Sequence, residues 1–165
     1  MFQKNDVVRY GSLGIFHIQD IITKKMPDGT EKLCYVLHTQ QTLETRIVTP
    51  VDNSKLRRVF NEGELQALIA NMPKIEYEWI KDKKQREEFY QKALHSGDCM
   101  ALIQVIKSIY LVKEEKEKKG KSISYTDLSV FQEAQRQLWE EVAYSAHIAI
   151  EDADAYIRNH IPSTL

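Results

Sequence analysis

The residue types that most often do chemistry in proteins are widely scattered in this sequence. None of the five histidines stands in an HExxH pattern or another metal-ligand spacing. Cys34 and Cys99 lie far apart, which excludes a CxxC metal site and a disulfide framework. The turn between Gly11 and Gly14 lacks the lysine of a phosphate-binding loop. The histidines are His17, His38, His95, His147 and His160. We expect no enzyme, no metal site and no cofactor.

A tryptophan followed by cations lies in the middle third of the chain, the only plausible place for phosphate contacts. Trp79 lies in a stretch without a clear buried period, just before a helix that Asp82 is expected to cap. The basic side chains that follow it are Lys81, Lys83, Lys84 and Arg86. The alternative is that Trp79 packs against the preceding helix. Trp139, by contrast, sits on an amphipathic helix and is expected in the core.

Acidic residues reduce the net positive charge of this basic stretch. Glu87 and Glu88 can pair with Lys83 and Lys84 at the i, i+4 spacing, so part of the positive charge would stabilise the helix. The net charge is −1; residues 74–121 carry twelve basic and nine acidic side chains, and residues 122–165 carry two and seven. The sequence therefore predicts few phosphate contacts and weak affinity of the isolated protein for nucleic acid.

The 165 residues divide in character near residue 60. The first part holds short runs of β-branched and aromatic residues separated by turns such as Pro27-Asp28-Gly29, which predicts about five strands. So many short strands in so few residues favour closure into a small SH3/Tudor-like β-barrel over residues 1–59.

After Asn61 the apolar residues follow a helical period. A capping box at Asn61-Glu62-Gly63-Glu64 begins the first helix, and Pro73 ends it. Ser96-Gly97-Asp98 separates a second helix from a third, and further apolar stripes run from Leu128 and from Ile150. The short connections predict a compact all-α domain over residues 60–165, and an α+β protein overall.

Membrane and secretion signals are not recognised in the sequence. No apolar run approaches the roughly 18 residues of a membrane span, and the N-terminus lacks the basic and apolar regions of a signal peptide. We expect a cytoplasmic protein that has neither a membrane partner nor a small-molecule substrate.

Several motifs together resemble the CarD/CdnL family of bacterial transcription regulators. The order and spacing of these motifs over nearly the whole chain make the match specific. They are Phe2-x-x-x-Asp6-x-Val8-x-Tyr10-Gly11 with Gly14-Ile15, Tyr35-Val36-Leu37, Val48-Thr49-Pro50-Val51-Asp52-Asn53, Leu56-Arg57-Arg58-Val59, Lys92-x-Leu94-x-Ser96-Gly97-Asp98, Val105-Ile106-Lys107-Ser108-Ile109-Tyr110, and Glu133-Ala134-Gln135-Arg136-Gln137-Leu138 with Glu141-Val142-Ala143.

The resemblance implies a bridge between RNA polymerase and promoter DNA. The barrel would bind the polymerase β subunit, and the helical domain would reach DNA at the upstream edge of the melted bubble and stabilise the open complex. Trp79 would then wedge into the minor groove without reading sequence, with Lys81, Lys83, Lys84 and Arg86 as its neighbours. In the family pattern the tryptophan position corresponds to Lys83, one helical turn after Trp79.

The resemblance also implies the polymerase contacts. Lys24 matches a basic residue that the family bears after its second strand, and Lys25 and Met26 follow it. The family's arginine two residues before the proline is replaced by Val48, and Arg46 lies on the same strand face. Alternatively, these lysines are ordinary exposed turn residues. A protein–protein adaptor that never touches DNA is the second functional interpretation.

Overall fold

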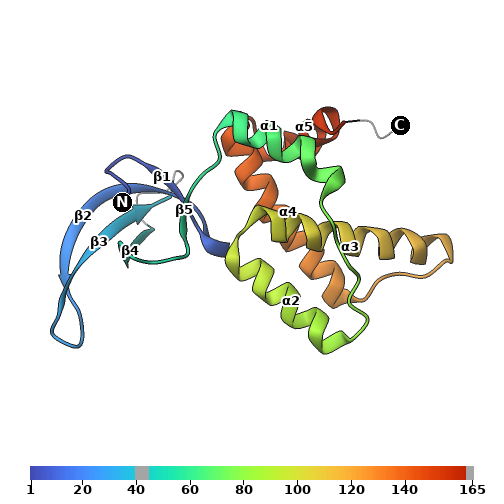
Figure 1. The fold of residues 1–165 in the computed structure, drawn as a ribbon, viewed down its shortest axis with the longest axis horizontal. Coiled ribbons are helices and arrows are strands. Elements are labelled where there is room, and N and C mark those ends of the chain that lie inside the picture. Colours follow the sequence, from blue (N-terminus) through green and yellow to red (C-terminus); the bar gives the residue numbers. More distant parts are fainter. Residues whose placement is uncertain (40–44, 163–165) are drawn as a thin grey trace. The chain divides into compact units, whose positions relative to one another are not determined.

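The protein folds into two compact units in a computed structural model that describes residues 1–39 and 45–162 (Figure 1). The first unit is Met1–Val59 and the second is Phe60–Leu165. The first contains strands and the second helices, which confirms the predicted α+β class. None of the helices in the described part of the chain is long and apolar enough to cross a membrane.

The first unit is an antiparallel sheet of five strands in the order β4-β3-β2-β1-β5. Its strands are β1 (Val7–Tyr10), β2 (Gly14–Lys25), β3 (Glu31–His38), β4 (Arg46–Pro50) and β5 (Leu56–Arg58). Alternating side chains place an apolar cluster on one face, because neighbours along a strand point to opposite sides. This cluster contains Val8, Phe16, Ile18, Tyr35, Leu37 and Leu56.

A tight turn joins β2 to β3, as the Pro27-Asp28-Gly29 signal predicts. The Met26 amide donates to the Thr30 carbonyl at 2.7 Å. Gly29 has a φ of +87°, a conformation that is open to glycine at little cost. The hairpin extends from β2, the longest strand of the sheet (Figure 1).

The closed SH3/Tudor-like barrel is not confirmed, because the sheet is open. A barrel requires its two edge strands to pair, and no ladder joins β4 to β5 among the described residues. The reason is the shortness of these edges: β5 has three residues and pairs with β1, and β4 has five and pairs with β3. A side chain links β4 to β1, since the Asn53 amide donates to Tyr10 Oη at 3.0 Å and to Thr49 Oγ1 at 2.8 Å.

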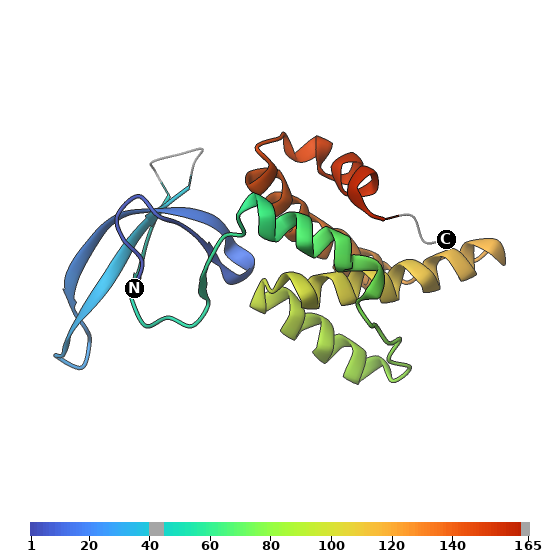
Figure 2. The same ribbon diagram turned by 45° about the horizontal axis from the view of Figure 1, so that its top comes forward.

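The second unit is a bundle of five α-helices with local start and stop signals (Figure 2). They are α1 (Glu62–Asn71), α2 (Lys83–Ser96), α3 (Cys99–Lys118), α4 (Tyr125–Ala146) and α5 (Ala153–His160). Both hydrogen bonds of the predicted capping box at Asn61 and Glu64 are present, at 2.8 and 2.9 Å. Gly97 ends α2 with a φ of +63°, and Asp98 caps α3 by accepting from the Ala101 amide.

The core of this unit lies around α3 and α4. Helices α1 and α5 pack on α4, and α2 packs on α3 (Figure 2). The apolar stripes predicted from the sequence supply fully buried residues such as Leu65, Leu102, Ile109 and Ala134. Trp139 is half-buried and packs against this core, as predicted.

Polar side chains of α4 hold the first residue of the helical unit in place. The Phe60 amide donates to Glu141 Oε1 at 3.3 Å, and Ser145 Oγ donates to the Phe60 carbonyl at 2.7 Å. The Cys99 thiol donates to Glu141 Oε2 at 3.1 Å. Glu141 is only 1% exposed, so these donors satisfy a carboxylate buried from water. The helical unit therefore begins at a fixed point on α4.

Candidate polymerase and nucleic-acid interfaces

The predicted polymerase contacts Lys24, Arg46 and Val48 lie on one face of the sheet. Lys24 is opposite Lys32, Arg46 is opposite His38, and Val48 is opposite Val36. Residues directly opposite each other on antiparallel strands share a face, and alternate residues of β3 do as well. Lys24 and Arg46 are exposed, and Val48 is half-buried.

The register of the strands also places Lys24 and Arg46 far apart. They lie beside opposite ends of β3, next to Lys32 and His38, which are roughly 20 Å apart at about 3.4 Å per residue. A partner that uses both must therefore cover the length of the strand. Lys25 is exposed and pairs with Glu31 on the other face, and Met26 is half-buried in the turn.

Two histidines stack beside Arg46 on this face. The rings of His17 and His38 are 5.5 Å apart at an interplanar angle of 19°. Burial lowers the pKa of His17 below 6.5, and the positive charge that His38 can carry lowers this pKa further. His38 Nδ1 lies 3.0 Å from the Thr39 carbonyl oxygen. The arrangement favours a neutral His17.

This histidine pair predicts that the sheet unit loses stability in mild acid. Because the pKa of His17 is lower in the folded state, the unfolded state binds more protons, and stability falls as the pH drops below 6.5. Urea unfolding of wild type and His17→Gln between pH 8 and pH 5 measures this effect. We expect a smaller loss in the variant. Parallel pH profiles for the two proteins would contradict it.

Trp79 is half-buried and packs against the helical core. The Arg86 guanidinium carbon lies 4.5 Å from the centroid of the indole ring, within the range of a cation–π contact. Arg86 Nη1 also donates to the carbonyls of Ile80 and Lys81, at 3.1 and 3.3 Å. Arg86 thus holds the segment that bears Trp79 against α2.

The Arg86 side chain is directed into the protein. Only 14% of it is exposed, and its Nε lies 3.6 Å from Oδ1 of Asp127, whose side chain is 7% exposed. Ser124 Oγ donates to the other carboxylate oxygen of Asp127 at 2.8 Å. Burial raises the pKa of nearby Tyr90, and the Asp127 charge adds to this rise. These contacts form a buried charged cluster between α2 and α4.

The three predicted lysines remain at the surface. Lys81, Lys83 and Lys84 are exposed. The predicted pair of Lys83 with Glu87 is present at 3.9 Å, with both side chains largely in water. Such a pair contributes at most about 1 kcal/mol to stability and leaves the lysine accessible to phosphate.

Tertiary contacts bring together two helix starts that are distant in sequence. Arg86 is in the first turns of α2 and Asp127 is in the first turn of α4, so their contact brings the two N-termini close together. Helix N-termini attract anions through their free amides and the helix dipole. The end of α3 and the turn that follows it carry Lys118, Lys119 and Lys121, which are all exposed. The sequence pattern predicts only a solvated helix end and turn at these lysines.

No group of three or more metal-ligating side chains occurs within residues 1–39 and 45–162. What the two units offer are a sheet face that carries Lys24 and Arg46, and a helical face with Trp79 beside exposed lysines.

Comparison with known families identifies the family of the protein. Residues 69–158 match the model described as the CarD C-terminal domain, and this match covers more than half of the chain. The chain belongs to the CarD family, a family of non-enzymatic transcription factors, which confirms the resemblance seen in the sequence. The comparison with curated proteins found no match.

Proposed function

We propose that this protein binds the RNA polymerase β subunit through its N-terminal sheet and contacts promoter DNA through its helical unit. The contact lies at the upstream edge of the melted bubble and stabilises the open complex. The observation that carries the proposal is the match to the CarD C-terminal domain over residues 69–158, a range that includes Trp79 and its lysines. The separate sheet unit supports a division of labour between the two partners.

The charge of the helical surface fits a DNA contact that works only when tethered. Exposed Lys81, Lys83 and Lys84 lie near the acidic residues Glu78 and Glu87, so affinity for free DNA should be weak. Tethering to polymerase raises the local concentration of the surface to the order of millimolar. Non-specific dissociation constants of about 10⁻⁴ to 10⁻⁶ M then give substantial occupancy.

Trp79 is the proposed wedge at the fork of the bubble. Inserting an apolar side chain between base pairs costs a few kcal/mol of unstacking, and this cost is already largely met where the strands are separating. The Arg86 cation on the indole ring and the bonds of Arg86 to Ile80 and Lys81 hold the tryptophan in place before DNA arrives. This restraint lowers the entropy lost on binding.

A protein–protein adaptor without DNA contact is the second candidate. The observation that favours it is the position of Trp79, which is half-buried against the helical core. In that case the tryptophan serves packing, and the lysines of α2 serve solubility.

Copurification with RNA polymerase tests the first half of the proposal. A tagged form of the full chain should retain the core polymerase, and the purified complex should form open complexes that live longer than those of polymerase alone. Failure to retain polymerase would contradict the first candidate function. Retention without a change in lifetime would favour the adaptor.

Charge reversal on the sheet should weaken polymerase capture. Lys24→Glu and Arg46→Glu each remove a cation from the proposed face and place a carboxylate there, and we expect about a tenfold loss of affinity for the double variant, or about 1.4 kcal/mol. Lys4→Glu changes the charge of an exposed residue in the same unit outside the strands and is the control. Pull-down of the β subunit measures the effect; equal capture by both variants would remove this face from the interface.

A further inference from the structure

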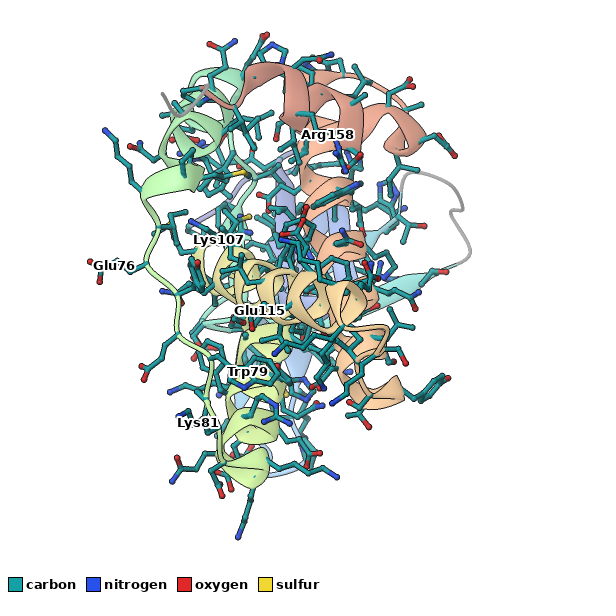
Figure 3. All side chains as sticks on the ribbon, turned by 90° about the vertical axis from the view of Figure 1, so that its right-hand side faces the viewer. Glu76, Trp79, Lys81, Lys107, Glu115 and Arg158 are labelled. Atoms are coloured by element: carbon teal, nitrogen blue, oxygen red, sulfur yellow. The ribbon has the colours of Figure 1, made fainter. Side chains whose placement is uncertain are left out.

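An extended segment crosses the surface of the helical unit between α1 and α2. It follows a short 3₁₀ turn, η2 (Met72–Lys74), and runs through residues 75–81 without joining a helix or a sheet. Ile75 has φ −67° and ψ 119°, which are extended values. In Figure 3 the segment descends along one side of the bundle, and Glu76 points away from the helices.

Two cations fix this segment at its two ends. At the first end Lys107 Nζ donates to the carbonyls of Met72, Pro73 and Ile75, at 2.8, 3.3 and 2.8 Å. Burial lowers the pKa of this lysine. Its ammonium also lies 5.1 Å from the centroid of the Tyr77 ring. The bundle therefore holds the start of the segment firmly.

At the other end Arg86 donates to the carbonyls of Ile80 and Lys81, at 3.1 and 3.3 Å. Between the two clamps, the peptide groups of Glu76 to Trp79 make no hydrogen bond within residues 1–39 and 45–162. The structure thus presents a short backbone segment outside helix and sheet, with amides and carbonyls that are open to a partner. Such a backbone is the template that strand addition uses.

The side chains around this edge indicate which peptide it fits. Glu76 and Glu78 are exposed, and both line one cavity. The volume of this cavity is about 500 Å³. Its lining combines these carboxylates with aromatic, aliphatic and amide groups: Glu76, Tyr77, Glu78, Ile80, Phe89 and Gln104. A basic side chain complements the carboxylates, and an apolar side chain complements Ile80 and Phe89.

We propose that residues 76–79 form a docking edge for an extended segment of a partner protein in which basic and apolar residues alternate. The peptide would add as a strand along Glu76 to Trp79, place lysine or arginine against Glu76 and Glu78, and insert an apolar side chain beside Phe89. The occupant is a protein segment, because the two carboxylates would repel the phosphates of DNA. The edge shares Trp79 with the proposed DNA contact, and the carboxylates that select the peptide lie on the residues before it.

The contacts of Lys107 and Arg86 with the segment reduce the entropy that is lost when a peptide binds to this edge. Binding an extended peptide normally costs entropy on both sides of the new ladder. Here Lys107 and Arg86 already hold one strand in its bound conformation, so that only the incoming peptide must become ordered. Charge complementarity at the rim then sets the register of the added strand.

The test uses the full chain and a fluorescein-labelled nine-residue peptide of alternating lysine and valine. Fluorescence anisotropy should show saturable binding, and amide NMR signals of residues 76–79 should shift on titration. The Glu76→Lys/Glu78→Lys variant should bind at least tenfold more weakly. The matched control, Glu115→Lys/Glu151→Lys, reverses two exposed carboxylates elsewhere on the unit and should change affinity less than twofold.

A second peptide separates strand addition from simple charge attraction. Methylation of alternate backbone nitrogens removes the donors of one peptide edge and keeps every charge, and it should abolish binding. Equal affinity of the methylated peptide would overturn the proposal, as would shifts that avoid residues 76–79. Tighter binding of a DNA duplex than of the lysine–valine peptide at the same edge would assign it to nucleic acid and would also overturn the proposal.

Discussion

Replacing Arg86 with alanine should lower the free energy of unfolding of the helical unit by about 3 kcal/mol, the loss typical of breaking a buried ion pair. The variant leaves the Asp127 carboxylate, 7% exposed, without its countercharge. It also removes the donor to Ile80 and Lys81 and the cation on Trp79. Urea unfolding followed by far-ultraviolet circular dichroism measures the loss.

Arg136 supplies the matched control. It forms ion pairs with Glu133 at 2.7 Å and Glu140 at 3.2 Å, but its side chain is 47% exposed. Exposed pairs contribute at most about 1 kcal/mol each, so Arg136→Ala should have a clearly smaller effect. Equal losses for the two alanine variants would show that burial of the Arg86 pair contributes nothing.

A double variant distinguishes the ion pair from the packing of the side chain. Arg86→Met with Asp127→Leu replaces both charges by apolar groups of similar size. Because the desolvation penalty then disappears together with the attraction, the double variant should be more stable than Arg86→Ala. A double variant that is less stable would mean that the Asp127 carboxylate stabilises the unit without Arg86, through its hydrogen bond from Ser124 Oγ.

Replacing Trp79 with alanine should shorten the lifetime of the open complex by about tenfold while polymerase binding is unchanged. An aromatic contact with a base contributes about 1–3 kcal/mol, and 1.4 kcal/mol corresponds to a factor of ten. Since Trp79 also packs against the helical core, the folded fraction of the variant must be established at the assay temperature. Filter binding after a competitor challenge gives the lifetime.

Trp139 is the control for this experiment. It is also half-buried against the same core, and it lies on α4, outside the segment that carries the lysines. Trp139→Ala should cost stability without shortening the lifetime of the open complex. If Trp79→Ala and Trp139→Ala gave the same lifetime as wild type, the helical unit would act as an adaptor.

The helix boundaries could be predicted because their signals are local. Asn61, Asp82 and Asp98 each accept a hydrogen bond from an amide three residues later, and Gly97 takes the left-handed conformation that ends α2. All these interactions close within a few residues. Burial of the apolar stripes follows from the helical period in the same way.

The candidate site could be predicted only in part. The exposure of Lys81, Lys83 and Lys84 agrees with their place next to a cap in a polar stretch. The inward direction of Arg86 could not be predicted, since its partner Asp127 lies 41 positions away in the sequence and no local pattern connects the two. For the same reason, the closeness of the start of α4 to the start of α2 could not be predicted.

By itself, the sequence determined the family, the change from strands to helices near residue 60, and the residues that begin the first three α-helices, because these depend on order, period and neighbours along the chain. Only the tertiary structure decided that the sheet stays open, that Lys24 and Arg46 lie at opposite ends of β3, and that Arg86 serves the interior. These outcomes depend on which distant groups meet. A contact between residues that are distant in sequence depends on how the whole chain packs. The spacing of neighbouring residues does not predict it.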